Sequence, residues 1–272
     1  MESWEHFRHR KRLSTFNYIR SVAIRRASRI PTRLSLHGNY NYQYTTVEIV
    51  YEDNHIIIVN KACGEIVQGD KTGDAPLSDD LKRYIKERDA KPGNVFIGVT
   101  HRLDRPVSGL VLFAKTSKAL SRLNDMFRRG EIRKTYWALT SGVPAEQEAT
   151  LTHWLVRNEK QNKSYAYTHE IDGAKRAILS YKVIGKTQRY NLIEVELHTG
   201  RHHQIRCQLA KIGCPIKGDL KYGARRSNPN GGISLVARKM EFIHPVSKRA
   251  ISVTAPLPDE QAWREIQMQK RI

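Results

Sequence analysis

One short segment of the sequence places an acidic residue among basic ones. In residues 101–110, HRLDRPVSGL, Asp104 lies between Arg102 and Arg105. Neighbouring guanidinium groups favour the charged form of a carboxyl group, so we expect Asp104 to be ionised at neutral pH. An ionised carboxylate in a loop can act as a nucleophile or as a base when a substrate atom comes within reach. From these residues alone, a salt bridge that fixes the turn is the alternative.

A second segment, residues 197–206 (LHTGRHHQIR), is typical of a strand that ends and a helix that begins. Helix N-termini attract anions such as phosphate. On the expected helix, residues 201–212, His202 and Arg206 lie one turn apart, whereas His202 and His203 point about 100° apart. Because no third ligand has useful spacing, a phosphate or carboxylate site at the helix end is favoured over a metal site.

A third segment, residues 133–139 (RKTYWAL), contains the aromatic residues that strands favour. Successive side chains of a strand face opposite sides of a sheet, so one of Tyr136 and Trp137 enters the core while the other lines a cleft. For a lone tyrosine, a place in the core is the alternative. Two weaker segments, residues 60–64 and 213–219, are typical of turns.

The elements that position these segments begin at residue 47, where the pattern of the chain changes. Alternating apolar residues predict strands, and apolar residues at helical spacing predict helices. We expect strands at residues 47–51, 55–60, 95–99, 110–115, 134–140, 149–157, 174–184, 190–199, 233–242 and 251–254. We expect helices at residues 77–88, 116–129 and 201–212. Because strands outnumber helices in an irregular order, the sequence predicts an α+β fold with a mixed, mostly antiparallel sheet, flanking helices and a central cleft.

The composition limits the classes of partner and of fold. The 272 residues contain 47 Lys and Arg against 27 Asp and Glu, a net charge of +20 at neutral pH. This charge indicates a polyanionic partner, most simply nucleic acid, and a basic protein without such a partner is the alternative. No apolar run approaches the roughly 18 residues of a membrane-spanning helix. The three cysteines, Cys63, Cys207 and Cys214, are scattered, which argues against a zinc module and against a disulfide scaffold.

Residues 1–44 differ from the remainder of the chain. They contain eight Arg and one Lys against two Glu. Three interpretations stay open: an organelle transit peptide, a basic arm that binds RNA, and an upstream extension of the reading frame. We therefore divide the chain into a basic extension (1–44), a main domain (45–258) and a C-terminal tail (259–272) that we expect to be helical.

Four motifs follow one another along the main domain. They are HRLD with a following Ser-Gly-Leu at 101–110, K-x-Y-x-A at 134–138, TGRxHQIR at 199–206, and G-x-P-I-x-G-D-x-x-Y-G at 213–223. Together with the opening stretch VEIVYEDNHIIIVNK, these motifs resemble the RluA family of pseudouridine synthases. The resemblance runs from residue 47 to residue 258, about four-fifths of the chain.

The resemblance implies the pseudouridine synthase fold and an isomerase that converts uridine in RNA into pseudouridine. No redox change occurs in that reaction, so no cofactor is expected. By resemblance, Asp104 is the catalytic carboxylate, Arg102 helps to displace the target base, and Tyr136 packs against this base. Arg206 is the implied partner that orients Asp104. The other implied substrate-binding residues are His101, Arg201, His203, Gln204 and Ile205.

The implied partner is ribosomal or transfer RNA. We expect no metal, no membrane attachment and a monomer in the cytoplasm, or in an organelle if residues 1–44 are a transit peptide. The carboxylate can attack C1′ of the ribose or remove the 2′ proton, and the sequence does not choose between these steps. A non-catalytic RNA-binding or ribosome assembly protein on the same fold is the alternative function. A glycoside hydrolase would need a second carboxylate, and no second acid accompanies the motifs.

Overall fold

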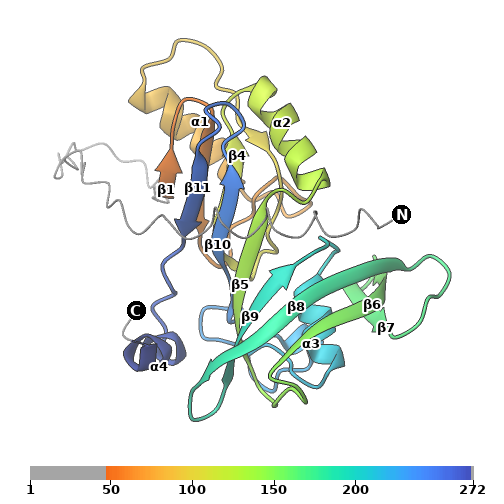
Figure 1. The fold of residues 1–272 in the computed structure, drawn as a ribbon. Coiled ribbons are helices and arrows are strands. Elements are labelled where there is room, and N and C mark those ends of the chain that lie inside the picture. The colour runs from red at the N-terminus through yellow and green to blue at the C-terminus, as the bar shows by residue number, and fades with distance from the viewer. Residues whose placement is uncertain (1–46, 271–272) are drawn as a thin grey trace, which may run out of the picture. The chain divides into compact units, whose positions relative to one another are not determined.

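The computed structural model describes residues 47–270, in which helices pack against a mixed sheet (Figure 1). The strands are β1 (Glu48–Glu52), β2 (Ile56–Lys61), β3 (Gly98–Val99), β4 (Ser108–Ala114), β5 (Arg133–Thr140), β6 (Glu148–Asn158), β7 (Lys163–Tyr167), β8 (Lys175–Lys186), β9 (Asn191–Leu197), β10 (Leu235–Ile243) and β11 (Ala250–Thr254). The helices are α1 (Leu77–Arg88), α2 (Ser117–Arg128), α3 (Gln204–Lys211) and α4 (Gln261–Lys270), with a 3-10 turn, η1 (Leu220–Tyr222).

The strand order in the sheet is β1-β2-β4-β10-β5-β9-β8-β6-β7, with β3 beside β4 and β11 beside β10. Within residues 47–270, β4 and β10 form a parallel pair and the other strand pairs are antiparallel. The α+β class with a mixed, mostly antiparallel sheet is therefore confirmed. In the parallel pair, Ser108 lies opposite Val236, so the segment before β4 is held beside the start of β10.

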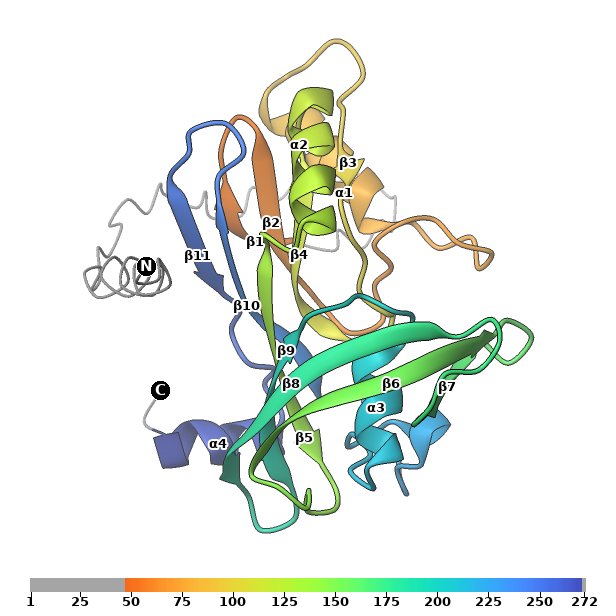
Figure 2. The same ribbon diagram turned by 45° about the vertical axis from the view of Figure 1, so that its right-hand side comes forward.

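Helices α1 and α2 cover opposite faces of β2 and β4. Ile56 and Ile58 pack against Leu123 of α2, whereas Ile57 and Val59 pack on the face that α1 covers. Because both faces are covered, the whole apolar run of β2 is buried, and it does not alternate with polar residues. Figure 2 shows α1 and α2 at the end of the sheet away from α3 and α4.

Helix α3 covers the other half of the sheet, where the functional motifs meet. Its residues Ile205 and Leu209 pack with apolar side chains of β5, β8 and β9. Helix α4 packs against the opposite face of β5, where Trp263 is fully buried beside Trp137. The sheet between these helices is therefore a rigid support for side chains on β5.

Three elements differ from the predictions. The five-residue strand β7 is absent from the predicted strands, because its sequence KSYAY is short and mostly polar. Strand β3 spans only Gly98–Val99, whereas the predicted strand covers residues 95–99. Helix α3 begins at Gln204, three residues later than predicted, because His203 has a left-handed backbone with φ of 51°.

Among residues 47–270, no helix combines the length and the apolar character needed to cross a membrane. The basic extension predicted at residues 1–44 lies outside the described residues.

Candidate active site

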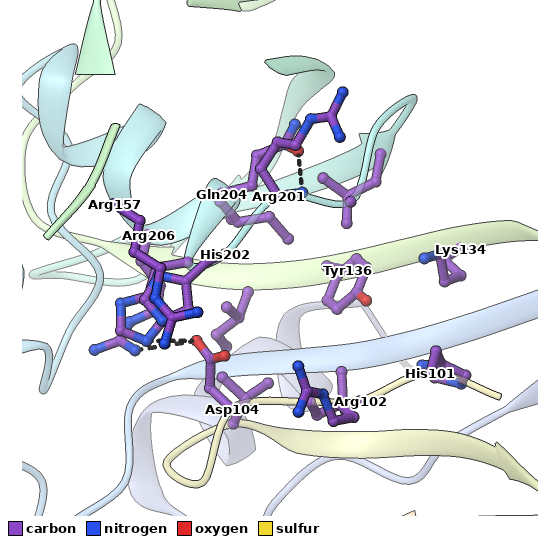
Figure 3. A pocket seen from close by; sticks show the side chains of 17 residues that line it. His101, Arg102, Asp104, Lys134, Tyr136, Arg157, Arg201, His202, Gln204 and Arg206 are labelled. Carbon is purple, nitrogen blue, oxygen red and sulfur yellow. Dashed lines mark hydrogen bonds and ion pairs between the residues drawn. The ribbon is translucent and has the colours of Figure 1, made fainter. Parts of the chain in front are cut away.

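A cavity of about 370 Å³ lies where the loop between β3 and β4 approaches the loop between β9 and α3 (Figure 3). The first loop supplies Arg102 and Asp104, and the second supplies Arg201 and His202. Tyr136 of strand β5 also lines the cavity. Three of the four sequence motifs therefore contribute to one cavity.

Lys61, at the end of β2, stabilises the loop that carries Asp104 from the side away from the cavity. Its ammonium group donates hydrogen bonds to the backbone carbonyl oxygens of Ala62, Arg105 and Val107, at 2.8, 3.1 and 2.7 Å. The side chain is fully buried, and this burial lowers the pKa of Lys61 from 10.5 to about 8. At neutral pH the group is still protonated and has one proton for each of the three carbonyls.

Gly109 lets the same loop enter β4 directly against β10. Its φ is 112°, and a Cβ atom at this position would lie 2.4 Å from the carbonyl oxygen of Ala237. A side chain at residue 109 would therefore push apart the two strands that support the loop.

The carboxylate of Asp104 is held through one of its two oxygen atoms. Oδ2 accepts a hydrogen bond from Arg206 Nη1 at 3.0 Å, and His203 Nε2 lies 3.4 Å from the same oxygen. Among residues 47–270, no group forms a hydrogen bond with Oδ1. Figure 3 shows this carboxylate directed into the cavity. One oxygen is thus fixed while the other is free to meet a substrate.

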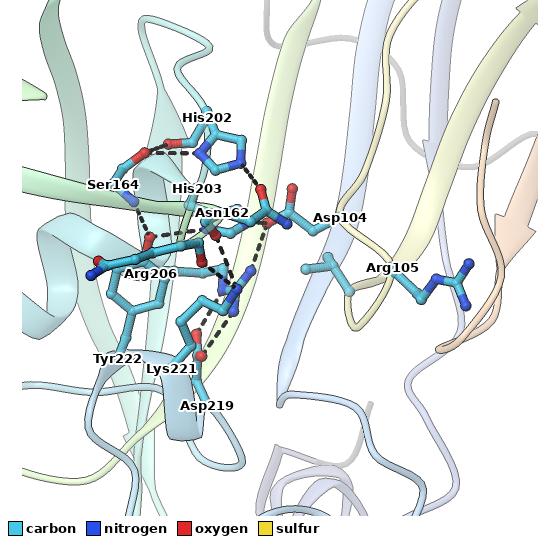
Figure 4. Close-up of polar contacts among 12 residues, drawn as sticks. Asp104, Arg105, Asn162, Ser164, His202, His203, Arg206, Asp219, Lys221 and Tyr222 are labelled. Atoms are coloured by element: carbon cyan, nitrogen blue, oxygen red, sulfur yellow. Dashed lines mark hydrogen bonds and ion pairs between the residues drawn. The ribbon is translucent and has the colours of Figure 1, made fainter. Parts of the chain in front are cut away.

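The basic neighbours of Asp104 in the sequence do not hold its carboxylate. The guanidinium group of Arg105 points away and donates hydrogen bonds to Asp74 at 2.6 Å and to Thr72 at 2.8 Å (Figure 4). Arg102 lines the cavity, and no ion pair joins it to Asp104. The guanidinium group that contacts Asp104 belongs to Arg206.

Arg206 is itself fixed by groups outside the cavity wall. Its Nε and Nη2 atoms donate to the two carboxylate oxygens of Asp219, at 2.7 and 2.9 Å. Only 6% of the Arg206 side chain and 1% of the Asp219 side chain are exposed. The guanidinium carbon also lies 5.0 Å from the centroid of the Tyr222 ring. The structure pairs Arg206 with Asp104, as the resemblance implies, and uses the remaining nitrogen for this pair.

His202 and His203 precede α3 and do not lie on it. Their rings are stacked with centroids 3.8 Å apart, so the prediction that they point in different directions was wrong. The anionic group beside the start of α3 is the carboxylate of Asp104 itself. Within residues 47–270, no group of three or more His, Cys, Asp or Glu side chains could hold a metal ion.

Each of these histidines has its own hydrogen-bond partners. Nδ1 of His202 lies 2.9 Å from Oγ of Ser164, and Nδ1 of His203 lies 2.9 Å from the hydroxyl oxygen of Tyr222. Burial, followed by the charge of Arg206, lowers the pKa of His203 to about 2. The imidazole of His203 is therefore neutral at physiological pH.

Tyr136 and Trp137 face opposite sides of β5, as predicted. The ring of Tyr136 forms one wall of the cavity and is 6% exposed. Burial, together with the charge of Asp104, raises the pKa of Tyr136 well above its usual value, so its phenol is protonated at neutral pH. Trp137 lies on the α4 side, where its indole N–H donates to Glu194 at 3.0 Å.

Most of the other predicted substrate-binding residues line the cavity but are bonded within the protein. His101 Nε2 accepts the backbone N–H of Leu112 at 3.1 Å, and burial lowers its pKa to about 3. Gln204 accepts the backbone N–H of Arg201 at 2.9 Å through its side-chain oxygen. Ile205 is a core residue with 4% exposure. His101, Gln204 and Ile205 therefore shape the wall, whereas the Arg201 side chain is exposed at the rim.

Sequence reasoning missed several residues of the site. Lys134 lines the cavity beside Tyr136, and the two-residue spacing in K-x-Y-x-A already places both side chains on one face of a strand. Arg157 of β6 also lines the cavity and belongs to no motif. Asp219 and Tyr222 belong to the motif at 213–223, whose first part is typical of a turn.

The arrangement can bind a flat ring that is attached to a sugar and a phosphate chain. A base can stack on Tyr136 while the free oxygen of Asp104 faces the sugar. Cationic side chains around the cavity are suited to phosphate groups. These cations belong to Arg102, Lys134, Arg157 and Arg201.

Residues 55–211 match the model of a family described as RNA pseudouridylate synthase. Over 219 residues the chain is 31% identical to the uncharacterized RNA pseudouridine synthase YlyB of Bacillus subtilis, a match that covers 79% of this chain and 71% of that protein. It is 30% identical over 240 residues to the ribosomal large subunit pseudouridine synthase D of Pseudomonas aeruginosa, covering 83% of this chain and 73% of that protein.

The fold is shared with a solved structure. The protein "Human RNA Pseudouridylate Synthase Domain Containing 4" superposes with a TM-score of 0.66 at 22% identity, over 82% of this chain and 93% of that chain. The family match spans more than half of the sequence, and it includes the Asp104 loop, Tyr136 and Arg206. The chain belongs to the RNA pseudouridylate synthase family, whose members convert uridine in RNA into pseudouridine.

Proposed function

We propose that this chain isomerises uridines of ribosomal or transfer RNA, with Asp104 as the catalytic carboxylate. The name of the Pseudomonas aeruginosa relative favours ribosomal large-subunit RNA as the first substrate to test. The net charge of +20 suits a long polyanion of this kind.

One observation carries the proposal: the free oxygen of Asp104 lies in a cavity beside the ring of Tyr136. Arg206 holds Oδ2 at 3.0 Å and leaves Oδ1 without a hydrogen bond to any described residue. A nucleophile or a base needs one unblocked oxygen whose direction is fixed, and this geometry provides it.

The isomerisation exchanges one bond to the sugar for another. The bond from C1′ to N1 of the base breaks, the base turns, and a bond from C1′ to C5 forms. N1 gains a proton and C5 loses one, so atoms and electrons balance without an electron acceptor. Asp104 can assist the first step by attacking C1′ or by removing the 2′ proton, because either step uses the same free oxygen.

The target base has to leave the stacked RNA before it can reach Asp104. Enzymes that act on a base turn it out of the stack into a pocket and receive it on an aromatic side chain. Tyr136 has the buried, flat surface for this contact. Arg102 lies at the cavity without an ion pair to Asp104, so its guanidinium group is free to fill the space that the base vacates.

Hydrolysis of the glycosidic bond is disfavoured by the composition of the cavity wall. Glycoside hydrolases use a pair of carboxyl groups, one as an acid and one as a base or nucleophile. Asp104 is the sole carboxylate among the described residues that line this cavity. A single carboxylate suits an isomerisation in which the base stays bound to the enzyme.

Transcribed ribosomal and transfer RNAs, incubated with the protein and mapped for pseudouridine by chemical probing, test this proposal. The wild-type protein should modify specific uridines, and Asp104→Asn should yield no product while its RNA affinity stays close to the wild-type value. Asp125→Asn is the matched control, because it removes an exposed carboxylate on α2. Substantial product from Asp104→Asn would exclude Asp104 as the catalytic group.

A further inference from the structure

His203 connects the carboxylate of Asp104 to a buried tyrosine. One ring nitrogen, Nε2, lies 3.4 Å from Oδ2 of Asp104, and the other, Nδ1, lies 2.9 Å from the hydroxyl oxygen of Tyr222. The side chain is buried, and its backbone has a left-handed φ of 51°. Because a non-glycine residue adopts this conformation at an energetic cost, the surrounding contacts determine where the ring lies.

The hydroxyl group of Tyr222 restricts where the proton of His203 can be. The backbone N–H of Ser164 donates to the Tyr222 oxygen at 2.8 Å, so the hydroxyl proton must go elsewhere. Nδ1 of His203 is the acceptor that the hydroxyl reaches within residues 47–270. If Nδ1 carried the proton instead, the hydroxyl proton would have no acceptor in that part of the chain, and the bare Nε2 lone pair would face the anionic Asp104.

A doubly protonated ring does not fit this environment. The charged and titratable groups that face His203 are Asp104 of the loop before β4, Arg206 of α3, His202, Arg157 of β6, and Lys221 and Tyr222 of η1. Cations outnumber the single acid, and the ring is removed from water. Burial and these cations favour a neutral imidazole, in agreement with a pKa lowered to about 2.

We propose that Tyr222 is a positioning residue that fixes the tautomer of His203. The Tyr222 hydroxyl donates to Nδ1, so the single ring proton is placed on Nε2 and faces Oδ2 of Asp104. This inference rests on the proposed role of Asp104 as the catalytic carboxylate.

The tautomer matters because it decides whether Asp104 Oδ2 meets a donor or a lone pair. With the proton on Nε2, the oxygen faces two N–H groups, one of Arg206 at 3.0 Å and one of His203 at 3.4 Å, and only one of these groups is charged. The carboxylate plane is then fixed, and Oδ1 keeps its direction into the cavity. With the proton on Nδ1, the Nε2 lone pair repels Oδ2 and turns the carboxylate away from the substrate.

Nitrogen-15 NMR of protein labelled at histidine reads the tautomer directly. At neutral pH the wild-type spectrum should show His203 with a bare Nδ1 and a protonated Nε2, whereas Tyr222→Phe should show a mixture of both tautomers. Tyr222→Phe keeps the ring that packs beneath Arg206 and removes only the hydroxyl group. An unchanged, pure Nε2–H tautomer in Tyr222→Phe would overturn the inference.

Turnover provides an independent measurement. Tyr222→Phe should lower kcat by roughly tenfold, the order of magnitude of one hydrogen bond, without changing RNA affinity. Tyr181→Phe is the matched control, because it also removes a tyrosine hydroxyl, one that donates to a backbone carbonyl at 3.1 Å, and it should keep wild-type kcat.

A double variant separates positioning from a structural role. His203→Gln places an amide N–H toward Asp104 and has no tautomers, so it should retain more activity than His203→Ala. In the His203→Gln background, Tyr222→Phe should have no further effect on kcat, because Tyr222 acts through the ring that has been removed. An equal reduction in both backgrounds would show that Tyr222 is merely structural.

The two proposals fail in different ways. If the wild-type protein formed no pseudouridine in any RNA, the proposed function would fail while the NMR spectra would still decide the tautomer. If Asp104→Asn were inactive but Tyr222→Phe had wild-type kcat and an unmixed tautomer, the function would stand and the role of Tyr222 would be rejected.

Discussion

The carboxylate of Asp219 accepts two hydrogen bonds from Arg206, at 2.7 and 2.9 Å. Both side chains are almost completely buried, and Asp219 does not line the cavity. This planar, two-point contact fixes the guanidinium group and leaves one nitrogen to hold Asp104 at 3.0 Å. The orientation of the carboxylate that we propose as catalytic is therefore set by a residue outside the cavity wall.

Asp219→Asn should lower both stability and turnover. It leaves the buried Arg206 without the charge that faces two of its nitrogens, and breaking a buried ion pair costs on the order of 3 kcal/mol. The free energy of unfolding in urea and kcat at saturating RNA should both fall. Asp125→Asn removes an exposed pair with Arg128 and should change the unfolding free energy by less than about 1 kcal/mol. Equal unfolding free energies for the two variants would show that the charge of Asp219 does not stabilise the fold.

The sequence predicted those helices whose first and last residues are set by capping residues close to them in the chain. Helix α1 spans the predicted residues, and α2 begins where Thr116 Oγ1 accepts the backbone N–H of Ala119 at 3.1 Å. It ends before Gly130, which has a φ of 70°. Caps and stops of this kind are set within four residues, so the sequence alone reveals them.

The site was less predictable because its contacts join distant segments. The role of Arg206 followed from the resemblance, but its partner Asp219 lies in a segment that the sequence predicts to be a turn. The start of α3 differs from the prediction because the left-handed backbone of His203 is maintained by contacts with Tyr222 and Asp104. Arg105 is adjacent to Asp104 in sequence and yet points away, since the loop conformation depends on Lys61 and on packing against β10.

Lys61→Met should loosen the loop that carries Asp104. It removes one hydrogen bond from each of three backbone carbonyl groups. Arg105 keeps the N–H of Gly64 at 2.9 Å, and each group left unsatisfied costs about 1–3 kcal/mol. We expect kcat to fall while RNA affinity is retained, because Lys61 lies behind the loop and outside the cavity wall. Lys82→Met, an exposed lysine on α1, is the matched control for turnover.

The wild-type protein and Lys61→Met should also differ in the pH dependence of stability. The folded-state pKa of Lys61, about 8, is below its ordinary value of 10.5, so between these values the unfolded chain binds more protons. The contribution of Lys61 to the unfolding free energy therefore rises with pH across this window, by about 3 kcal/mol in total. The difference in unfolding free energy between wild type and Lys61→Met should show this rise, and a difference independent of pH would contradict it.

Arg157→Ala should weaken RNA binding because it removes a cation that we expect to contact an RNA phosphate. Arg157 is exposed, lines the cavity and has no carboxylate partner among residues 47–270. Each phosphate contact that is removed reduces the slope of log affinity against log salt by about 1. Arg128→Ala on α2 removes the same charge from a side chain that is 77% exposed and away from the cavity, and it should leave the slope unchanged. Equal slopes for both variants would place the RNA elsewhere.

Tyr136→Phe should separate base binding from proton transfer, because it keeps the ring and removes only the hydroxyl group. The phenol lies in the cavity and is protonated at neutral pH, so as a relay it takes the proton that C5 releases while it gives its own proton to solvent. We expect Tyr136→Phe to bind RNA and to break the C1′–N1 bond but to release product slowly, whereas Tyr136→Leu should also weaken base capture by roughly 1–3 kcal/mol. Release of deuterium from C5-labelled RNA measures the late step. Product release from Tyr136→Phe at the wild-type rate would leave Tyr136 as a stacking surface without a role in proton transfer.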